Sequence, residues 1–244
     1  MSQTALDQAL HMLQAVPFFT GVRRQDLAAL AAACRSRQYR PHEIIFHQDD
    51  PGDALHIVRA GQVRIVLLSP QGHEITLALF HPGDFFGELS LLDGCPRSAT
   101  AVAVVPTTTL TLARPAFLRV LANTPQVAQQ IILALSARLR HTDILLGDAV
   151  FLDVAARLAK RLGELARAQA EGAIPPTPWM VRVTQAELAA MVGATRESVN
   201  KELRVLQAQG LIRVGRGRIL LLRPDALSTR GNWEGSAPPD QARV

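Results

Sequence analysis

The chain has 244 residues, of which 48% are hydrophobic and 19% charged, with a formal net charge of +5. This length suits two modest domains, and the apolar content argues against a fibrous or wholly disordered chain. No apolar run reaches the ~20 residues that a membrane span needs, so we expect a cytoplasmic protein that does not enter a membrane. The two cysteines, Cys34 and Cys95, fit a reducing compartment and lack paired metal-ligand spacing.

The charge is unevenly distributed along the chain. Residues 1–149 carry 12 basic and 12 acidic side chains, whereas residues 150–230 carry 13 basic and 7 acidic ones, an excess of +6. A basic C-terminal part is typical of a module that binds a polyanion, although many solvated surfaces are also basic.

Short β-rich segments separated by turn signals fill the region from about residue 18 to residue 117. They are rich in Ile, Val, Leu and Thr, and glycine-containing turns separate them. This spacing predicts an antiparallel β-roll or sandwich. The clearest predicted strands are Ala54–Arg59, Gln62–Leu68, Glu74–Phe80 and Ala99–Val105.

A long helical pattern follows Arg114-Pro115 and runs to about Gly147, with a loose break at Asn123-Thr124-Pro125. Heptads along it give a mostly apolar stripe, which suits either a partner helix in a parallel coiled-coil dimer or the chain's own domain. We expect the partner helix. The stripe contains Leu121, Ala128, Leu135, Thr142 and Ala149 at one position, with Ile131, Arg138, Leu145 and Leu152 at the other, and the expected dimer contacts are Ile131, Leu135, Arg138, Thr142 and Leu145.

A second compact pattern follows this helix. Residues 150–167 are helical in pattern, and a turn or linker rich in proline follows at residues 172–178. Thr184 and Glu187 then form a capping box at the start of a further helix. The last residues, 228–244, are poor in apolar side chains and predict a mobile tail.

A helix-turn-helix pattern begins after this capping box. Residues 188–192 form the apolar first helix, Gly193 lies in the turn, and Thr195 is the expected N-cap of a second helix that opens with polar residues. Residues 211–221 predict a β-hairpin that serves as a wing. Many αα-hairpins bind nothing, so this pattern needs support from other parts of the chain.

The segments at residues 85–90 and 96–100 combine groups that suit a cyclic nucleotide. Gly87 lets the backbone approach a ligand closely, and Glu88 can accept a hydrogen bond from a ribose hydroxyl. Arg97 can make a planar, charge-assisted contact with the free oxygens of a cyclic phosphate, and Ser98 adds a hydroxyl donor. The alternative is an ordinary surface ion pair between Glu88 and Arg97.

Phe-Gly-Glu-Leu-Ser at 86–90 with Arg-Ser-Ala-Thr at 97–100 resembles the phosphate-binding cassette of the CRP/FNR family of transcription regulators, in its cyclic AMP receptor branch. The resemblance runs from about residue 18 to residue 227. It implies an α+β fold with a cyclic nucleotide-binding β-roll at 1–118, a dimerisation helix at 119–149 and a winged helix-turn-helix domain at 150–227, before the tail at 228–244. It also implies a homodimer that binds cyclic AMP, palindromic TGTGA-like double-stranded DNA and RNA polymerase.

The resemblance also assigns ligand-binding positions. The segment Phe151-Leu152-Asp153-Val154 aligns the long helix, so that Thr142 and Asp143 match a Thr-Ser pair that meets the purine in cyclic AMP-binding relatives. Asp143 cannot donate a hydrogen bond when ionised, but it can accept one from an exocyclic amine. The expected ligand-binding residues are Gly87, Glu88, Leu89, Arg97, Ser98, Thr142 and Asp143.

Residues 195–201, Thr-Arg-Glu-Ser-Val-Asn-Lys, resemble the family's recognition helix. Arg196 can bond guanine N7 and O6, and Glu197 can accept from cytosine N4. Lys201 stands where the founding member has arginine, and it can contact either a guanine or a phosphate. The expected DNA-binding residues are Thr195, Arg196, Glu197, Ser198, Asn200, Lys201, Arg213, Arg216 and Arg218, with the threonine and the wing arginines on phosphates.

Two other functions stay open. One is a regulator of the same family that binds DNA without nucleotide, or senses another ligand or the redox state. The other is a cyclic nucleotide-binding subunit that controls a partner enzyme, against which the basic C-terminal part argues. We expect no enzyme activity, because no catalytic grouping is present, and no metal or iron–sulfur cluster, because the cysteines form no cluster and no metal-ligand spacing is present. Haem ligands could be proposed among His73, His81 and His141, but the Glu88/Arg97 pair favours a nucleotide, so we expect no haem.

Overall fold

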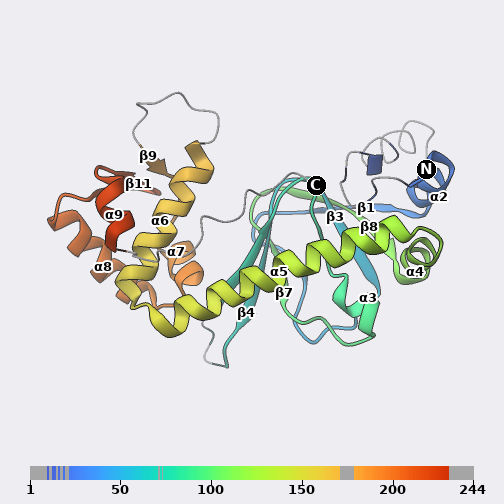
Figure 1. Cartoon of the computed structure of the whole chain (residues 1–244), viewed down its shortest axis with the longest axis horizontal. Coiled ribbons are helices and arrows are strands. Elements are labelled where there is room, and N and C mark those ends of the chain that lie inside the picture. The colour runs from blue at the N-terminus through green and yellow to red at the C-terminus, as the bar shows by residue number, and fades with distance from the viewer. Residues whose placement is uncertain are drawn as a thin grey trace. The chain divides into compact units, whose positions relative to one another are not determined.

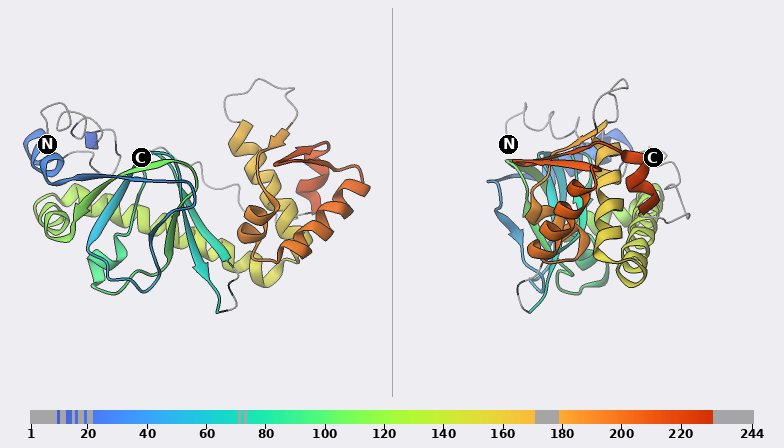
Figure 2. Two further views of the ribbon diagram at one scale, coloured as in Figure 1. Left: turned by 180° about the vertical axis from the view of Figure 1, so that it is seen from behind. Right: turned by 90° about the vertical axis from the view of Figure 1, so that its left-hand side faces the viewer.

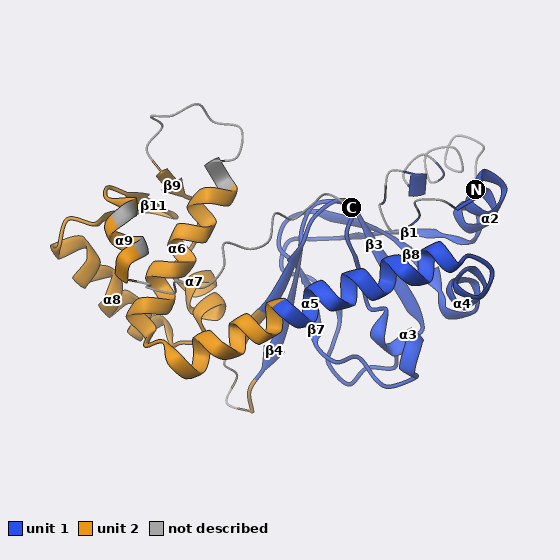
Figure 3. Cartoon of the chain, viewed as in Figure 1, with its two compact units in different colours: residues 1–68, 77–140 blue, residues 69–76, 141–244 orange. Residues whose placement is uncertain are grey.

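The computed structural model describes residues 22–70, 72, 74–170 and 179–230, together with residues 10, 13, 14, 16 and 19. The chain divides into two compact units, residues 1–68 with 77–140 and residues 69–76 with 141–244 (Figure 3). The expected linker at 172–178 lies outside the described residues. Within the described part, no helix is both long enough and apolar enough to span a membrane.

Two four-stranded sheets form the β-roll predicted from the sequence (Figure 1). Three of the four strands singled out in the sequence begin and end within a residue of their predicted bounds, and the fourth, expected at 99–105, is shorter. Further strands at residues 35–39, 44–46, 85–86 and 107–113 were not singled out. One sheet has the order β1 (Arg35–Tyr39), β8 (Thr107–Ala113), β3 (Ala54–Ala60) and β6 (Phe85–Phe86), and the other has the order β2 (Ile44–Phe46), β7 (Thr100–Ala103), β4 (Val63–Leu68) and β5 (Glu74–Phe80).

The two faces of the β1-β8-β3-β6 sheet differ, because side chains alternate along each strand. Leu110 pairs with Ile57, which pairs with Phe85, and all three lie in the core of unit 1. The opposite face carries His56, in register with Thr111 and Phe86. The apolar face is covered by helices α2 (Arg24–Ala33), α4 (Arg114–Asn123) and the first part of α5 (Pro125–Phe151) (Figures 1 and 2).

The loose break in the long helix is a true end. Helix α4 stops at Asn123, Thr124 has φ −137° and ψ 89°, and α5 begins at Pro125. Proline disfavours helical backbone in the residue before it and suits the first helical position. Leu121 therefore lies on α4 and not on the stripe of α5 where it was expected.

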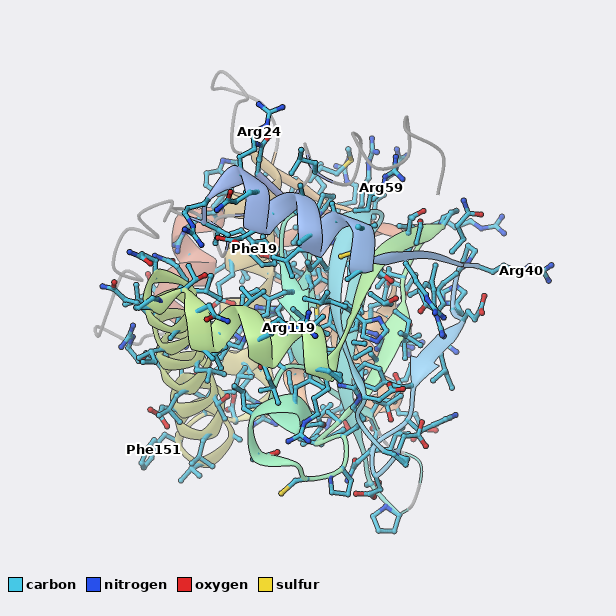
Figure 4. The ribbon with its side chains drawn as sticks, turned by 90° about the vertical axis from the view of Figure 1, so that its right-hand side faces the viewer. Phe19, Arg24, Arg40, Arg59, Arg119 and Phe151 are labelled. Carbon is cyan, nitrogen blue, oxygen red and sulfur yellow. The ribbon has the colours of Figure 1, made fainter. Side chains whose placement is uncertain are left out.

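The other end of α5 also corrects the sequence-based expectation. The helix does not end at about Gly147 but continues to Phe151, which is 72% exposed (Figure 4). Helix α6 (Val154–Ala170) then begins after Asp153, whose Oδ1 accepts a 2.8 Å hydrogen bond from the backbone N–H of Ala156. The side chain of Asp153 thus caps α6 and separates it from α5.

The exposed apolar stripe of α5 is shifted by one residue from the expected one. Ile131 is 3% exposed and lies in the core of unit 1, against which Leu135 also packs. By contrast Ile132, Leu139 and Leu146, spaced by seven residues, are each 63% exposed. Ile131 therefore packs within unit 1, and the next residue in each heptad is exposed.

Unit 2 has the expected winged helix-turn-helix architecture. Its core contains fully buried leucines from three helices, among them Leu158, Leu188 and Leu203. Its last helix, α9 (Pro224–Arg230), includes residues 228–230, so the expected tail does not begin at Ser228. After α6, the elements are β9 (Trp179–Val181), α7 (Gln185–Val192), α8 (Arg196–Ala208), β10 (Ile212–Gly215), β11 (Arg218–Leu221) and α9 (Pro224–Arg230), with sheet order β10-β11-β9.

Candidate functional site

Two glycines in unit 1 make room for the side chains of the cassette. Gly87 follows β6 with φ +81°, and a Cβ atom there would lie 2.5 Å from Arg97 Nη1. A Cβ atom on Gly52 would lie 2.2 Å from Ser90 Cβ and 3.3 Å from Arg97 Cζ. The separations of 2.5 Å and 2.2 Å are shorter than real Cβ contacts, so a side chain at either position would force Arg97 or Ser90 to move. The sequence indicated Gly87 for close approach to a ligand, whereas in the structure its close neighbour is Arg97.

The guanidinium group of Arg97 is buried and held on three sides. The residue is 3% exposed, its Nη1 donates to Gly87 O at 2.6 Å, and its Nη2 donates to Ala54 O at 2.8 Å. Its Cζ lies 4.2 Å from the centre of the Phe46 ring. Burial lowers the pKa of Arg97, while Asp53 and other nearby carboxylates raise it. Arginine keeps its charge under these conditions, so the site has a fixed buried cation.

Glu88 is held by a second arginine. Glu88 is 2% exposed, and its Oε1 accepts a 2.6 Å hydrogen bond from Arg138 Nη1. Arg138 also donates to Phe85 O, and its Cζ lies 4.7 Å from the ring centres of Phe80 and Phe85. Glu88 and Arg97 therefore do not form the surface ion pair that was the alternative, because both residues are buried and each has other partners.

Glu88 and Arg97 each have one buried side-chain atom without a hydrogen bond. Within the described residues, Glu88 Oε2 and Arg97 Nε have no partner. Leaving such a group unsatisfied costs about 1–3 kcal/mol, and more when it is charged. A ligand that brings a hydroxyl donor to Glu88 and an anionic oxygen to Arg97 would match both, as a cyclic nucleotide does.

The other expected ligand residues are more exposed. Leu89 and Ser98 are exposed within the cassette, while Thr142 and Asp143 are exposed on the part of α5 that belongs to unit 2. The structure thus brings together Gly87, Glu88 and Arg97.

Sequence reasoning missed three contributors to the cassette, namely Gly52, Ala54 and the role of Arg138. A signal for Arg138 existed, because an arginine on an otherwise apolar stripe predicts a buried partner.

The helix-turn-helix of unit 2 has the capping bonds that the sequence predicts. Thr184 Oγ1 accepts from Glu187 N–H at 3.2 Å, and Glu187 Oε2 accepts from Thr184 N–H at 2.7 Å. Gly193 ends α7 with φ +60°. Thr195 Oγ1 accepts from Ser198 N–H at 3.1 Å, which confirms it as the N-cap of α8. These bonds satisfy backbone donors that each helix start would otherwise leave free.

Helix α8 buries one face and exposes the other. Val199, Leu203 and Leu206 are buried in the core of unit 2. The exposed face carries Arg196, Glu197 and Lys201, together with Arg204, which sequence reasoning missed although it follows Lys201 by three residues. Of the other expected DNA-binding residues, Thr195, Arg213, Arg216 and Arg218 are exposed, and Ser198 and Asn200 are half-buried.

Arg157 of α6 joins two helix ends within unit 2. Its Nε donates to Val192 O at 2.8 Å, and its Nη1 donates to Leu152 O at 2.7 Å. These carbonyls lie at the last residue of α7 and just after α5, so one side chain ties the first helix of the helix-turn-helix to the end of the long helix. In the described part of the chain, no group of His, Cys, Asp and Glu side chains could hold a metal ion.

Two models of known domains match the chain, one in its N-terminal part and one in its C-terminal part. A model of the cyclic nucleotide-binding domain matches residues 36–124, and one of the Crp-like helix-turn-helix domain matches residues 156–230. The CRP-like cAMP-activated global transcriptional regulator of Mycobacterium tuberculosis is 34% identical over 215 residues, 87% of this chain and 95% of that protein. The cyclic AMP receptor protein of Thermus thermophilus is 36% identical over 203 residues, 83% of this chain and 91% of that one.

A solved structure extends the comparison. The c-di-GMP responsive global regulator CLP of Xanthomonas campestris has a TM-score of 0.74 and 25% identity, covering 82% of this chain and 99% of its own. The Mycobacterium and Xanthomonas proteins are named as global regulators, and the Thermus protein is named as a receptor for cyclic AMP. With a ligand cassette in one unit and a capped helix-turn-helix in the other, the chain belongs to the CRP/FNR family and is a cyclic nucleotide-dependent transcription regulator that binds DNA.

Proposed function

We propose that the chain is a cyclic AMP-responsive regulator that acts as a homodimer on palindromic TGTGA-like operators. The observation that carries the ligand assignment is the pair of buried, unpartnered atoms, Glu88 Oε2 and Arg97 Nε. Glu88 accepts from the ribose hydroxyl, and Arg97 binds the cyclic phosphate with Ser98 as a further donor. Leu89 contacts the rest of the nucleotide, and the resemblance assigns Thr142 and Asp143 to the purine, with Asp143 accepting from the adenine amine.

Dimerisation uses the exposed stripe of α5. Ile132, Leu139 and Leu146 repeat every seven residues, as in a coiled coil, and apolar side chains that are 63% exposed are costly to leave in water. Thr142 and Leu145 belong to the expected contacts and flank this stripe. Leu139→Asp should give a monomer by sedimentation equilibrium, whereas Leu133→Asp, at an exposed position off the stripe, should leave the dimer intact.

DNA recognition uses the exposed face of α8. Arg196 bonds guanine N7 and O6, and Glu197 accepts from cytosine N4 in the major groove. Lys201 and the wing arginines contact guanine or phosphates and fix the register. In the dimer, the two recognition helices then lie one DNA turn apart, roughly 34 Å. Cyclic nucleotide strengthens binding only as far as it prefers this arrangement.

The first test measures DNA binding with a labelled TGTGA palindrome. Cyclic AMP should tighten binding at a stated salt concentration, and Arg97→Ala should abolish the effect. Arg119→Ala, which removes an exposed arginine of α4 (Figure 4), is the matched control and should retain it. Arg196→Ala should cost about 1–3 kcal/mol on the palindrome and relax its base preference. Binding that ignores cyclic AMP would overturn the ligand assignment and keep the DNA assignment.

A cyclic dinucleotide is the second candidate effector. Asp143 replaces the serine of cyclic AMP-binding relatives, and one similar solved structure is named as c-di-GMP responsive. The same titration with cyclic di-GMP distinguishes the two, because only the true effector should change the DNA affinity.

We also expect the dimer to contact RNA polymerase in the cytoplasm, which a pull-down with purified polymerase on promoter DNA would test.

A further inference from the structure

Four aromatic side chains form a cluster beside the cassette. His56 and Phe86 lie on the face of the β1-β8-β3-β6 sheet opposite the helices, and Phe46 and Phe80 come from β2 and β5 of the other sheet. His56 stacks on Phe86 with ring centres 5.0 Å apart and an interplanar angle of 17°. Phe46 lies 5.5 Å from His56 and 5.8 Å from Phe86 in tilted arrangements, and Phe80 stacks on Phe86 at 5.9 Å. Phe86 and His56 are buried, whereas Phe46 and Phe80 are half-buried.

The two arginines of the cassette lie over the outer rings of this cluster. Arg97 lies over Phe46, and Arg138 lies over Phe80. The negative face of an aromatic ring attracts a cation, with a benefit of about 0.5–2 kcal/mol that is largest where water is excluded. Arg97 is 3% exposed, so its contact with Phe46 lies at the strong end of this range.

The ring and the carbonyls constrain Arg97 in different directions. Gly87 O and Ala54 O bind two edges of the guanidinium group and fix its position, but a rotation about the line of these bonds remains open. The face of Phe46 removes that rotation. Nε, the atom without a hydrogen-bond partner, then points in one direction.

His56 supports Phe46 without competing with Arg97. It is 5% exposed, and burial together with the positive charges of Arg97 and Arg37 lowers its pKa to about 3. Its ring is therefore neutral near neutral pH. A protonated His56 ring would repel Arg97 and weaken the stack of rings. The neutral ring therefore allows Phe46 and Arg97 to stay in contact.

We propose that Phe46, braced by His56 and Phe86, is a positioning residue that holds the guanidinium group of Arg97 in the plane in which it binds an anionic ligand. For its effect on ligand affinity, this inference rests on the proposed function of the cassette. The alternative is that Phe46 only fills space, in which case its electronic character would not matter.

The first experiment changes the electron density of the Phe46 ring with little change in its size. Phenylalanine carrying one, two or three fluorine atoms is introduced at position 46, which weakens the negative face of the ring stepwise. We expect cyclic AMP affinity, measured by calorimetry, to fall at each step, to a total loss of about 3–30-fold. The same series at Phe86, which packs in the same cluster but has no arginine over its ring in the described structure, should leave the affinity nearly constant. Equal affinity across the position-46 series would overturn the proposal.

The second experiment needs no ligand. The Nε–H signal of Arg97 in a proton–nitrogen NMR spectrum, assigned by its loss in Arg97→Lys, should be shifted by the Phe46 ring current. Across the fluorinated series at position 46, which keeps a ring in place, this signal should broaden step by step as the guanidinium group gains freedom to rotate, whereas Arg119→Lys should leave it unchanged. A signal that stays equally sharp across the series overturns the positioning role. If the wild-type protein binds no cyclic nucleotide, the proposed function fails, and this spectrum still decides the role of Phe46.

Discussion

Glu88 Oε1 and Arg138 Nη1 lie 2.6 Å apart and join the start of the cassette to helix α5, 50 residues further along the chain. Glu88 is almost fully buried, while the side chain of Arg138 is 28% exposed. In the described structure, Arg138 of the long helix is the one cation at hydrogen-bond distance from the carboxylate of Glu88. This pair gives a ligand that binds Glu88 a direct connection to α5.

Removing Arg138 should leave the buried carboxylate of Glu88 without a charged partner. Breaking a buried pair by deleting one partner costs about 3–5 kcal/mol, and we expect Arg138→Met to lie near the low end because Arg138 is partly exposed. Urea unfolding measures this loss. The double variant Glu88→Gln/Arg138→Met should recover part of it, since no charge is then stranded. Single-variant stability equal to the wild type would contradict the importance of the pair.

Substitutions at two glycines separate backbone strain from steric clash. Gly83 and Gly87 have φ +97° and +81°, so alanine at either position should cost about 1–2 kcal/mol. At Gly83 no atom lies within 4 Å of the new Cβ, whereas at Gly87 Arg97 Nη1 lies at 2.5 Å. Gly87→Ala should therefore lose more stability in urea and also bind cyclic nucleotide more weakly. Equal losses in the two variants would show that Arg97 yields without cost.

His56 makes stability depend on pH. Its pKa is about 3 in the folded protein and about 6.5 when unfolded, so between these values the unfolded chain holds more protons. The free energy of unfolding should therefore fall as the pH falls below about 6.5, by about 2 kcal/mol between pH 7 and pH 5. Other groups also titrate, so the comparison is with His56→Phe, which keeps a stacked ring. A constant difference between the two proteins across this range would contradict a neutral buried His56.

The two cysteines should differ in reactivity. Cys34 is 3% exposed, and burial raises its pKa to about 11, whereas Cys95 is exposed. The thiolate is the reactive form, so iodoacetamide should modify native Cys95 about 100-fold faster than Cys34. Peptide mass spectrometry measures both rates, and urea should remove the difference. Cys95→Ser should leave a native protein that is nearly inert, and rapid labelling of that variant would refute the burial of Cys34.

Prediction from sequence succeeded where a pattern depends on near neighbours. Segments rich in β-favouring residues between turn signals predicted strands β3, β4 and β5 closely, and the caps at Thr184 and Thr195 followed from residues three positions apart. The strand β8 was not singled out, although threonine and leucine favour strands; its Thr107, Thr109 and Thr111 are buried, which the rule of apolar interiors does not anticipate. Their neighbours across the sheet include His56, which is equally polar.

The register of the long helix shows why the rest could not be predicted. Ile131 and Ile132 are chemically identical, so no local rule decides which one faces the core. That choice depends on packing against Leu55, Phe85 and other residues far away in the sequence. A shift of one residue turns a helical side chain by about 100°, which is enough to exchange a buried face for an exposed one.

The sequence by itself determined the family, the order of the elements, the caps and the candidates Gly87, Glu88 and Arg97, because these depend on short segments of fixed spacing. Only the tertiary structure decided which partners those side chains have. Arg97 binds Gly87 O, Ala54 O and the Phe46 ring, and Glu88 binds Arg138. The physical reason is that a buried charge binds the groups that the fold brings within about 3 Å of it. These groups are far apart in the sequence and share no sequence pattern that would identify them.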